Sequence, residues 1–319
     1  MKVKIIFVMK HLVLALLICG GLYWLSMHRK GQGKDIPRRL GQFEKVSPNI
    51  VLIGNSVLRA GIDETMLSQL MNKRIFMASS NGSASVWWYL YIKNVVGEVC
   101  HKPEVAVIFF RDHYLTLPKF RTEGKFRKPL RMLSRPQEPL VEQLAYGKDV
   151  VPMVWARAEA KERLERRILK TAAKFVGVNK NVASDALANV LGESQMIPEF
   201  VTRQQLASEQ VNDMRDLDFD ACLSRSLLPH MISMLHEKGV KLVLVRCKRR
   251  RDTQNDGESI AVQEYMKQLS NYVRANDVSL IDFTHDDRLT LSHYGPGDHL
   301  NDEGKRVFTQ MVAEKLAML

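Results

Sequence analysis

Cysteine is scarce in this chain of 319 residues, which has only four. They are Cys19, Cys100, Cys222 and Cys247. None is spaced like the paired cysteines of a zinc site, and so few cannot build a dense disulfide framework. Cys19 lies in an apolar N-terminal stretch, so the remaining three allow one disulfide at most. We expect no metal and no cofactor.

A nucleic-acid-binding signature is also missing, although the net charge is +12. The basic residues are spread over 157–170, 248–251 and the stretch that follows the apolar N-terminus. No helix-turn-helix, zinc or aromatic RNA-binding motif accompanies them. We therefore expect no nucleic-acid partner, and we attribute the charge to a basic surface that faces anionic lipid or an acidic glycan.

Polar side chains are rare over residues 5–27, where Lys10 and His11 form the main interruption. An apolar stretch of about 20 residues crosses a bilayer, and this one is long enough if Lys10 reaches toward the interface. A cleaved signal peptide is the competing interpretation, but no small-x-small cleavage site follows the stretch. We predict a membrane anchor over residues 1–30, with residues 5–27 in the membrane.

The charges around this stretch leave its orientation open. Three lysines precede its core and five basic residues follow by residue 39, so the positive-inside rule is nearly balanced. Residues 31–46 are polar and basic and contain Pro37, which predicts a short linker. We expect one domain to follow over 47–319.

The rest of the chain alternates short apolar runs with helical patterns, and with 45% hydrophobic residues it has the content of a globular domain. Strands are predicted at 49–53, 74–78, 104–110, 240–245 and 280–283. Helices are predicted at 63–71, 85–96, 260–276 and 302–318. This alternation predicts an α/β fold with a doubly wound, mostly parallel sheet. Ligands of such sheets bind beyond the carboxyl ends of the strands.

An insertion of roughly 130 residues separates the third predicted strand from the fourth, far longer than an ordinary connection. Strong helix formers dominate residues 153–176, and charged residues there suit a solvated helix face. We predict a helical cap over about 117–220.

Polar residues follow the predicted strands at the edge where a ligand would bind. They are Gly54-Asn55-Ser56 after the first strand, Asn81-Gly82 after the second and Arg111-Asp112 after the third, and Asp298-His299 precedes the closing helix. Ser56 would begin a helix after a tight glycine turn, which leaves its hydroxyl beside backbone N–H donors. A serine needs a neighbouring base to become a nucleophile, and a histidine such as His299 suits that role near neutral pH.

The order of these segments resembles that of the SGNH/GDSL hydrolases. Residues 50–56, Ile-Val-Leu-Ile-Gly-Asn-Ser, look like the first block of that superfamily. Asn81-Gly82-Ser83 is similar to the second block, and residues 298–304, Asp-His-Leu-Asn-Asp-Glu-Gly, resemble the last. The resemblance covers about 49–319 with the insertion unmatched, and it implies a flavodoxin-like three-layer sandwich.

The resemblance implies a serine esterase or O-acetyltransferase. Ser56 would attack an ester carbonyl and His299 would accept the proton. The backbone N–H groups of Ser56 and Gly82 would stabilise the oxyanion.

The sequence departs from the family pattern at Arg111, which stands where an asparagine side chain would complete the oxyanion hole. An arginine there could hold the oxyanion or an acidic substrate group. It could equally be a structural partner of Asp112. Both interpretations stay open at the level of sequence.

A second departure concerns the acid that orients the histidine. The family has an aspartate three residues before it, whereas here that position is Pro296. Asp298 is the predicted substitute, and Asp286, Asp287 or a backbone carbonyl are the alternatives.

Within the superfamily, the anchor, the strand end at 109–112 and the terminus at 298–301 look most like proteins that act with membrane-bound O-acyltransferases in polysaccharide acetylation. That resemblance implies an acyl transferase or esterase for envelope polysaccharide or cell-wall glycan, with its domain outside the cytoplasmic membrane. A catalytically inactive binding or assembly subunit is the alternative, because of the missing asparagine and the missing aspartate.

Overall fold

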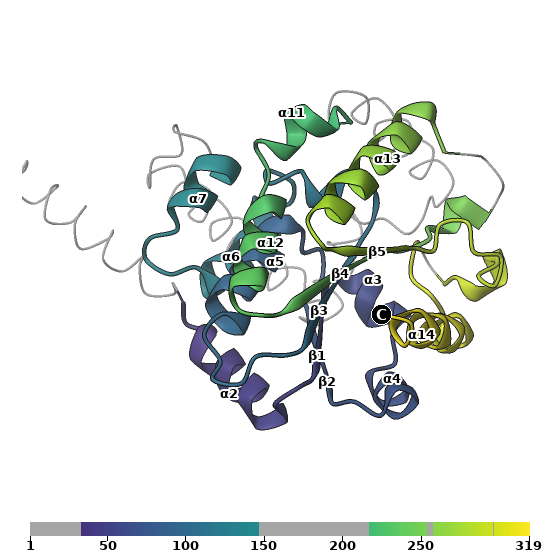
Figure 1. The fold of residues 1–319 in the computed structure, drawn as a ribbon, viewed down its shortest axis with the longest axis horizontal. Coiled ribbons are helices and arrows are strands. Elements are labelled where there is room, and N and C mark those ends of the chain that lie inside the picture. The colour runs from purple at the N-terminus through teal and green to yellow at the C-terminus, as the bar shows by residue number, and fades with distance from the viewer. Residues whose placement is uncertain (1–32, 147–216, 254–257, 296) are drawn as a thin grey trace, which may run out of the picture.

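The computed structural model describes residues 33–146, 217–253, 258–295 and 297–319, which form a five-stranded parallel sheet between two helical layers (Figure 1). The strands are β1 Ile50–Gly54, β2 Ile75–Ser79, β3 Val105–Phe110, β4 Lys241–Arg246 and β5 Ser279–Asp282. Their order in the sheet is β2-β1-β3-β4-β5. All five predicted strands are confirmed, as is the doubly wound parallel sheet. The strand order reverses between β1 and β3: β2 lies on one side of β1, and β3, β4 and β5 follow on the other. The loops after β1 and β3 therefore lead to opposite faces of the sheet.

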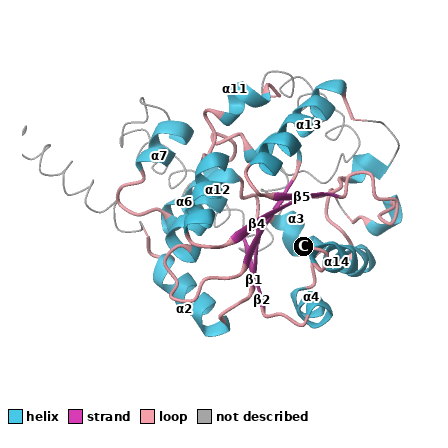
Figure 2. Cartoon of the chain, in the orientation of Figure 1, coloured by secondary structure: helices cyan, strands magenta, loops and turns pink. Residues whose placement is uncertain are grey.

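The two layers of helices cover opposite faces of the sheet (Figure 2). One layer holds α3 Ser56–Gly61, α4 Glu64–Met71 and α14 Asp302–Leu316. The other holds α2 Ile36–Val46, α5 Ser85–Tyr91, the π-helix η1 Ile92–Val96, α12 Leu228–Glu237 and α13 Ile260–Ala275. The predicted helices at 63–71, 85–96, 260–276 and 302–318 are therefore confirmed, to within a few residues at their ends.

Strand residues alternate between two apolar cores, as a pleated sheet requires. In β1, Val51 and Ile53 belong to the core under α5, α12 and α13, whereas Ile50 and Leu52 face α3, α4 and α14. Every residue of β1 is buried, because helices cover both faces of the sheet.

Residues 36–46 form the helix α2, whereas the sequence predicted a linker there. Asp35 precedes this helix and Pro37 stands in its first turn, where a missing N–H costs nothing. Phe43 is fully buried, with its ring centroid 5.4 Å from that of Phe76 in β2. The helix is amphipathic and packs against the sheet, but its basic and polar composition is also typical of a linker.

The described flanks of the long insertion are mostly short helices. They are η2 Asp112–Leu115, η3 Gly124–Phe126, α6 Arg127–Leu133, α7 Pro139–Val141, the π-helix η4 Glu142–Tyr146 and, on the far side, α11 Phe219–Leu223. Glu138 is buried and fastens this region to η1 by accepting hydrogen bonds from Lys93 Nζ at 2.5 Å and Asn94 Nδ2 at 2.8 Å. The predicted helix at 153–176 lies outside the described residues.

The predicted anchor at residues 5–27 also lies outside the described residues. Within the described ranges, no helix is long and apolar enough to cross a membrane. No disulfide joins any two of Cys100, Cys222 and Cys247, so the one disulfide that the sequence allowed does not form among them.

Candidate functional site

The turn after β1 presents Ser56 as the first residue of α3. A Cβ on Gly54 would lie 2.8 Å from Leu58 Cβ, so only glycine lets the helix fold back this closely on its strand. Asn55 caps the helix, since its Oδ1 accepts the Val57 N–H at 2.9 Å. Ser56 is half-buried, and its hydroxyl has no hydrogen-bond partner among the described residues.

Asn55 and Ser83 join the turn after β1 to the turn after β2. Asn55 is 5% exposed, and its Nδ2 donates to the Ser83 carbonyl at 3.3 Å. In the other direction the Ser83 hydroxyl donates to the Gly54 carbonyl at 3.0 Å, and the Ser80 N–H reaches the same oxygen at 3.2 Å. The sequence-based prediction assigned no role to either side chain. Their positions beside Ser56 and Gly82 could have indicated that they join the two turns.

Gly82 lies in the turn after β2 with φ at +67°, a conformation that favours glycine. The ring of Phe126 in η3 covers it, and a Cβ there would come within 2.2 Å of Phe126 Cε1. Neither the Ser56 N–H nor the Gly82 N–H donates to another protein group among the described residues. Two backbone donors are therefore available at the ends of neighbouring strands.

His299 lies in the loop between η6 Leu291–His293 and α14. Its carbonyl accepts the Gly295 N–H at 2.8 Å, and an antiparallel bridge joins Tyr294 to Leu300. Leu300 packs beside α3, since a Cβ on Gly61 would lie 3.9 Å from Leu300 Cδ1. The His299 side chain is exposed and forms no hydrogen bond with Ser56 or with a carboxylate in the described residues.

Arg111 and Asp298 form an ion pair across 187 residues of sequence. Arg111 Nη1 donates to Asp298 Oδ2, and the Arg250 backbone N–H donates to Oδ1 at 3.1 Å. The Asp298 carboxylate thus binds a guanidinium from the end of β3 and a backbone donor from the loop after β4. The sequence had placed Arg111 either on an oxyanion or beside Asp112, and it offered no signal for this pairing.

The other two candidate acids stand apart from His299. Asp286 binds Arg288 through both carboxylate oxygens, at 3.0 Å and 2.8 Å, and these hydrogen bonds lower its pKa. Asp287 is exposed and has no hydrogen-bond partner among the described residues. No described carboxylate therefore contacts the His299 ring.

Cys247 and Tyr294 lie close enough to Arg111 for its charge to act on both of their pKa values. Burial raises the pKa of the Cys247 thiol, just after β4, to about 12, against the opposing charge of Arg111. Burial also raises the pKa of Tyr294, whose hydroxyl donates to the Lys248 carbonyl at 3.1 Å. Both groups stay protonated at neutral pH.

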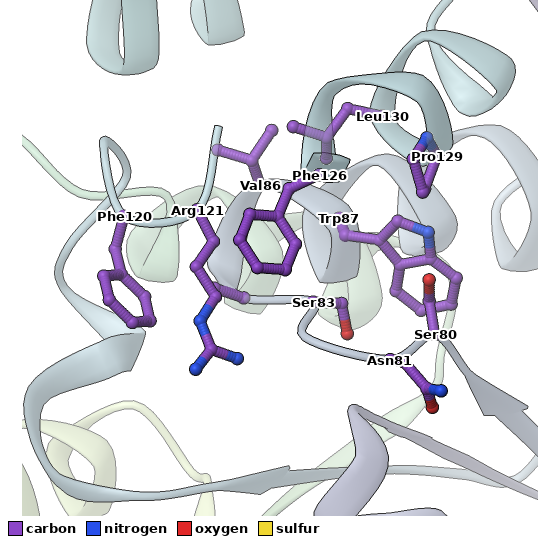
Figure 3. Close-up of a pocket in the computed structure, with 11 residues that line it drawn as sticks. Ser80, Asn81, Ser83, Val86, Trp87, Phe120, Arg121, Phe126, Pro129 and Leu130 are labelled. Carbon is purple, nitrogen blue, oxygen red and sulfur yellow. The ribbon is translucent and has the colours of Figure 1, made fainter. Parts of the chain in front are cut away.

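A small hollow adjoins the Gly82 turn (Figure 3). Figure 3 shows the Arg121 side chain between the rings of Phe120 and Phe126, with centroid distances of 4.9 Å and 5.4 Å to the guanidinium carbon. These are cation–π contacts. Ser80 and Asn81 line the opposite wall. Sequence patterns did not predict that Phe120, Arg121 and Phe126 of the long insertion would lie beside the β2 turn.

No known family model matches the chain, and no curated protein matches it. Its backbone is similar to that of a protein from Bacteroides fragilis assigned as an acylhydrolase, with 10% identity and a TM-score of 0.42 over 88% of this chain and 95% of that one. A Desulfitobacterium hafniense protein assigned to the G-D-S-L lipolytic family has 9% identity and a TM-score of 0.40 over 83% and 97%.

A third similar structure is a Streptococcus pneumoniae protein assigned as a platelet activating factor. Its identity is 13% and its TM-score 0.38, over 95% of this chain and 99% of that one.

Proposed function

We propose that this protein is a serine esterase or O-acyltransferase, with Ser56 as nucleophile and His299 as base. The observation that carries the proposal is the convergence of three segments at the switch point of the sheet. Ser56 follows β1, Gly82 follows β2, and the residues on either side of His299 contact the β3 end and α3. Ligand sites of doubly wound sheets form at this edge.

The chemistry would proceed through an acyl-enzyme. His299 takes the proton as Ser56 Oγ attacks the ester carbonyl, and the N–H groups of Ser56 and Gly82 stabilise the oxyanion. The alcohol leaves with the proton from His299, so the acyl group remains on Ser56. A water or an acceptor hydroxyl then attacks that acyl group, giving hydrolysis or transfer.

An envelope glycan is the acceptor we favour, with acetyl as the acyl group. Support comes from the apolar N-terminal stretch, which suits a location at the envelope, and from the basic surface charge, which suits an acidic glycan. A membrane-bound O-acyltransferase is the partner this proposal implies.

Labelling by a fluorophosphonate probe tests the nucleophile directly. The wild-type chain should be labelled at Ser56 and should release acetate from an aryl acetate, whereas Ser56→Ala should do neither. Ser68→Ala is a matched control, because Ser68 lies in α4 with its hydroxyl bonded to the Lys73 carbonyl at 2.5 Å. A folded wild-type chain that resists the probe would contradict the proposal.

A binding or assembly subunit is the second candidate function. It is favoured by the absence of a hydrogen bond between Ser56 and His299, and of a carboxylate on the His299 ring, among the described residues. Under this proposal Ser56→Ala would leave polysaccharide acetylation in cells unchanged, whereas loss of the whole protein would abolish it. Loss of acetylation in Ser56→Ala cells removes this candidate.

Location is a separate part of the proposal. We infer an anchor at residues 5–27 with the domain outside the cytoplasmic membrane. A reporter fused after Leu319 that is active only outside the membrane tests this inference. A reporter active only in the cytoplasm would rule out an envelope glycan as the substrate.

A further inference from the structure

We propose that Arg111 and Asp298 form a latch that positions His299, so that both residues act through the base and neither contacts the reacting atoms. This inference rests on the proposed function of Ser56 and His299. It reassigns two residues that sequence reasoning had placed in the oxyanion hole and in the triad.

The latch is anchored at the centre of the sheet. Arg111 directly follows β3, the central strand of the sheet, and its side chain is only 13% exposed. Its guanidinium holds one oxygen of Asp298, and the backbone of Arg250 holds the other at 3.1 Å. Charge-assisted bonds of this kind are stronger and more directional than neutral ones.

The remainder of the His299 loop is fixed on its other side. Leu300 packs beside Gly61, and Asn301 caps α14 by accepting the Gly304 N–H at 2.9 Å. Residue 298 is thus fixed to the ends of β3 and β4, and residues 300 and 301 are fixed to helices. His299 is held by these neighbours and by its own backbone carbonyl, which accepts the Gly295 N–H, whereas its ring forms no hydrogen bond, ion pair or ring contact among the described residues.

This geometry argues against the two earlier roles. The Asp298 carboxylate is directed to Arg111 and to the Arg250 backbone, and adjacent side chains usually diverge, so it is poorly placed to orient the His299 ring. A guanidinium engaged by Asp298 is likewise partly neutralised, which weakens its attraction for a developing oxyanion. The pair is better suited to fixing the loop than to chemistry.

Labelling kinetics in the full-length chain separate these roles. Arg111→Ala and Asp298→Ala should each slow fluorophosphonate labelling of Ser56, by up to about 10²-fold for a base displaced by roughly 1 Å. The double variant should be no slower than either single variant. In a His299→Ala background neither substitution should slow labelling further, because the residue they position is gone. Arg111→Lys should restore part of the rate.

Amide hydrogen exchange gives a readout that does not depend on chemistry. Peptides covering 294–301 should exchange faster in both single variants and equally fast in the double variant, while β4 peptides stay protected. Lys73→Ala is the control, since it breaks an exposed pair with Glu104 at the opposite edge of the sheet. It should change neither the labelling rate nor exchange in the loop.

Several outcomes would overturn the latch. They are unchanged exchange at 294–301, additive effects in the double variant, or further slowing in the His299→Ala background. Further slowing in the His299→Ala background would mean that Arg111 acts independently of His299, as a residue that stabilises the oxyanion would. If instead the wild-type chain is not labelled at all, the proposed function fails, and the exchange data still decide whether the pair holds the loop.

Discussion

At the level of single residues, Asn55 connects the turn after β1 to the turn after β2. Asn55→Ala removes the cap of α3 and leaves the Ser83 carbonyl without its donor. The expected loss is about 1–3 kcal/mol of unfolding free energy, with slower labelling of Ser56. Asp63→Ala, which uncaps α4 away from this turn, should cost about 1 kcal/mol and leave labelling unchanged. Urea unfolding and probe kinetics on both variants check this.

The buried thiol of Cys247 makes the unfolding free energy depend on pH in the alkaline range. Its folded pKa of about 12 lies above the value near 8.5 of an exposed thiol, so the unfolded chain releases this proton first. The stabilising contribution is complete below the unfolded pKa and is lost as pH rises toward the folded one. Unfolding free energies measured between about pH 8 and about pH 11 should therefore fall less steeply in Cys247→Ala. Cys100→Ala, at an exposed position, should keep the wild-type slope.

At the scale of elements, the turn after β2 depends on Gly82. Gly82→Ala imposes both a strained φ and a clash with Phe126, whereas Gly124→Ala imposes strain alone, since nothing lies within 4 Å of its added Cβ. Strain of this kind costs about 1–2 kcal/mol. Gly82→Ala should cost more than Gly124→Ala in urea unfolding, and only Gly82→Ala should slow labelling of Ser56. Equal losses would mean that Phe126 moves aside freely.

The helix α2 is the other element with a direct test. Phe43→Ala should cost about 3–5 kcal/mol, because a fully buried aromatic side chain leaves a cavity against Phe76. Glu44→Ala, at an exposed position on the same helix, should stay within about 0.5 kcal/mol of wild type. A small effect at Phe43 would mean that residues 36–46 act as a linker after all.

At the scale of the whole molecule, Arg246 joins the end of the sheet to the start of α13. It is 2% exposed and binds Asp282 Oδ2 at 3.0 Å and the Glu258 carboxylate. Arg246→Met leaves the Glu258 carboxylate, which is 9% exposed, without this partner, with an expected cost of about 3–5 kcal/mol.

Arg288 is the matched control for that prediction, since it also binds two carboxylates but is 44% exposed. Arg288→Met should cost at most about 1 kcal/mol, because water screens exposed ion pairs. Thermal and urea unfolding of both variants measure the difference. If Arg246→Met lowers the unfolding free energy as little as Arg288→Met does, Arg246 does not hold the end of the sheet to the start of α13.

The sheet could be predicted from sequence patterns alone, because the information for it is local. Apolar runs such as 104–110 predict strands buried on both faces, and Gly54 and Gly82 mark the turns that end β1 and β2. The helix α2 was missed because its apolar side chains are few and tertiary packing stabilises it. In a short basic segment, the helical spacing of a few apolar residues is a weaker indication than the overall polar composition.

The side chains that meet at the carboxyl edge could not be predicted from sequence patterns, because their pairing depends on the folded chain. Arg111 could take a partner nearby in sequence, yet its ion pair is with Asp298, 187 residues away. Phe126 covers Gly82 although the two lie in different loops. Such contacts depend on how loops fold over the ends of the strands, and loop paths follow from the packing of the whole chain. Spacing in the sequence carries no record of them.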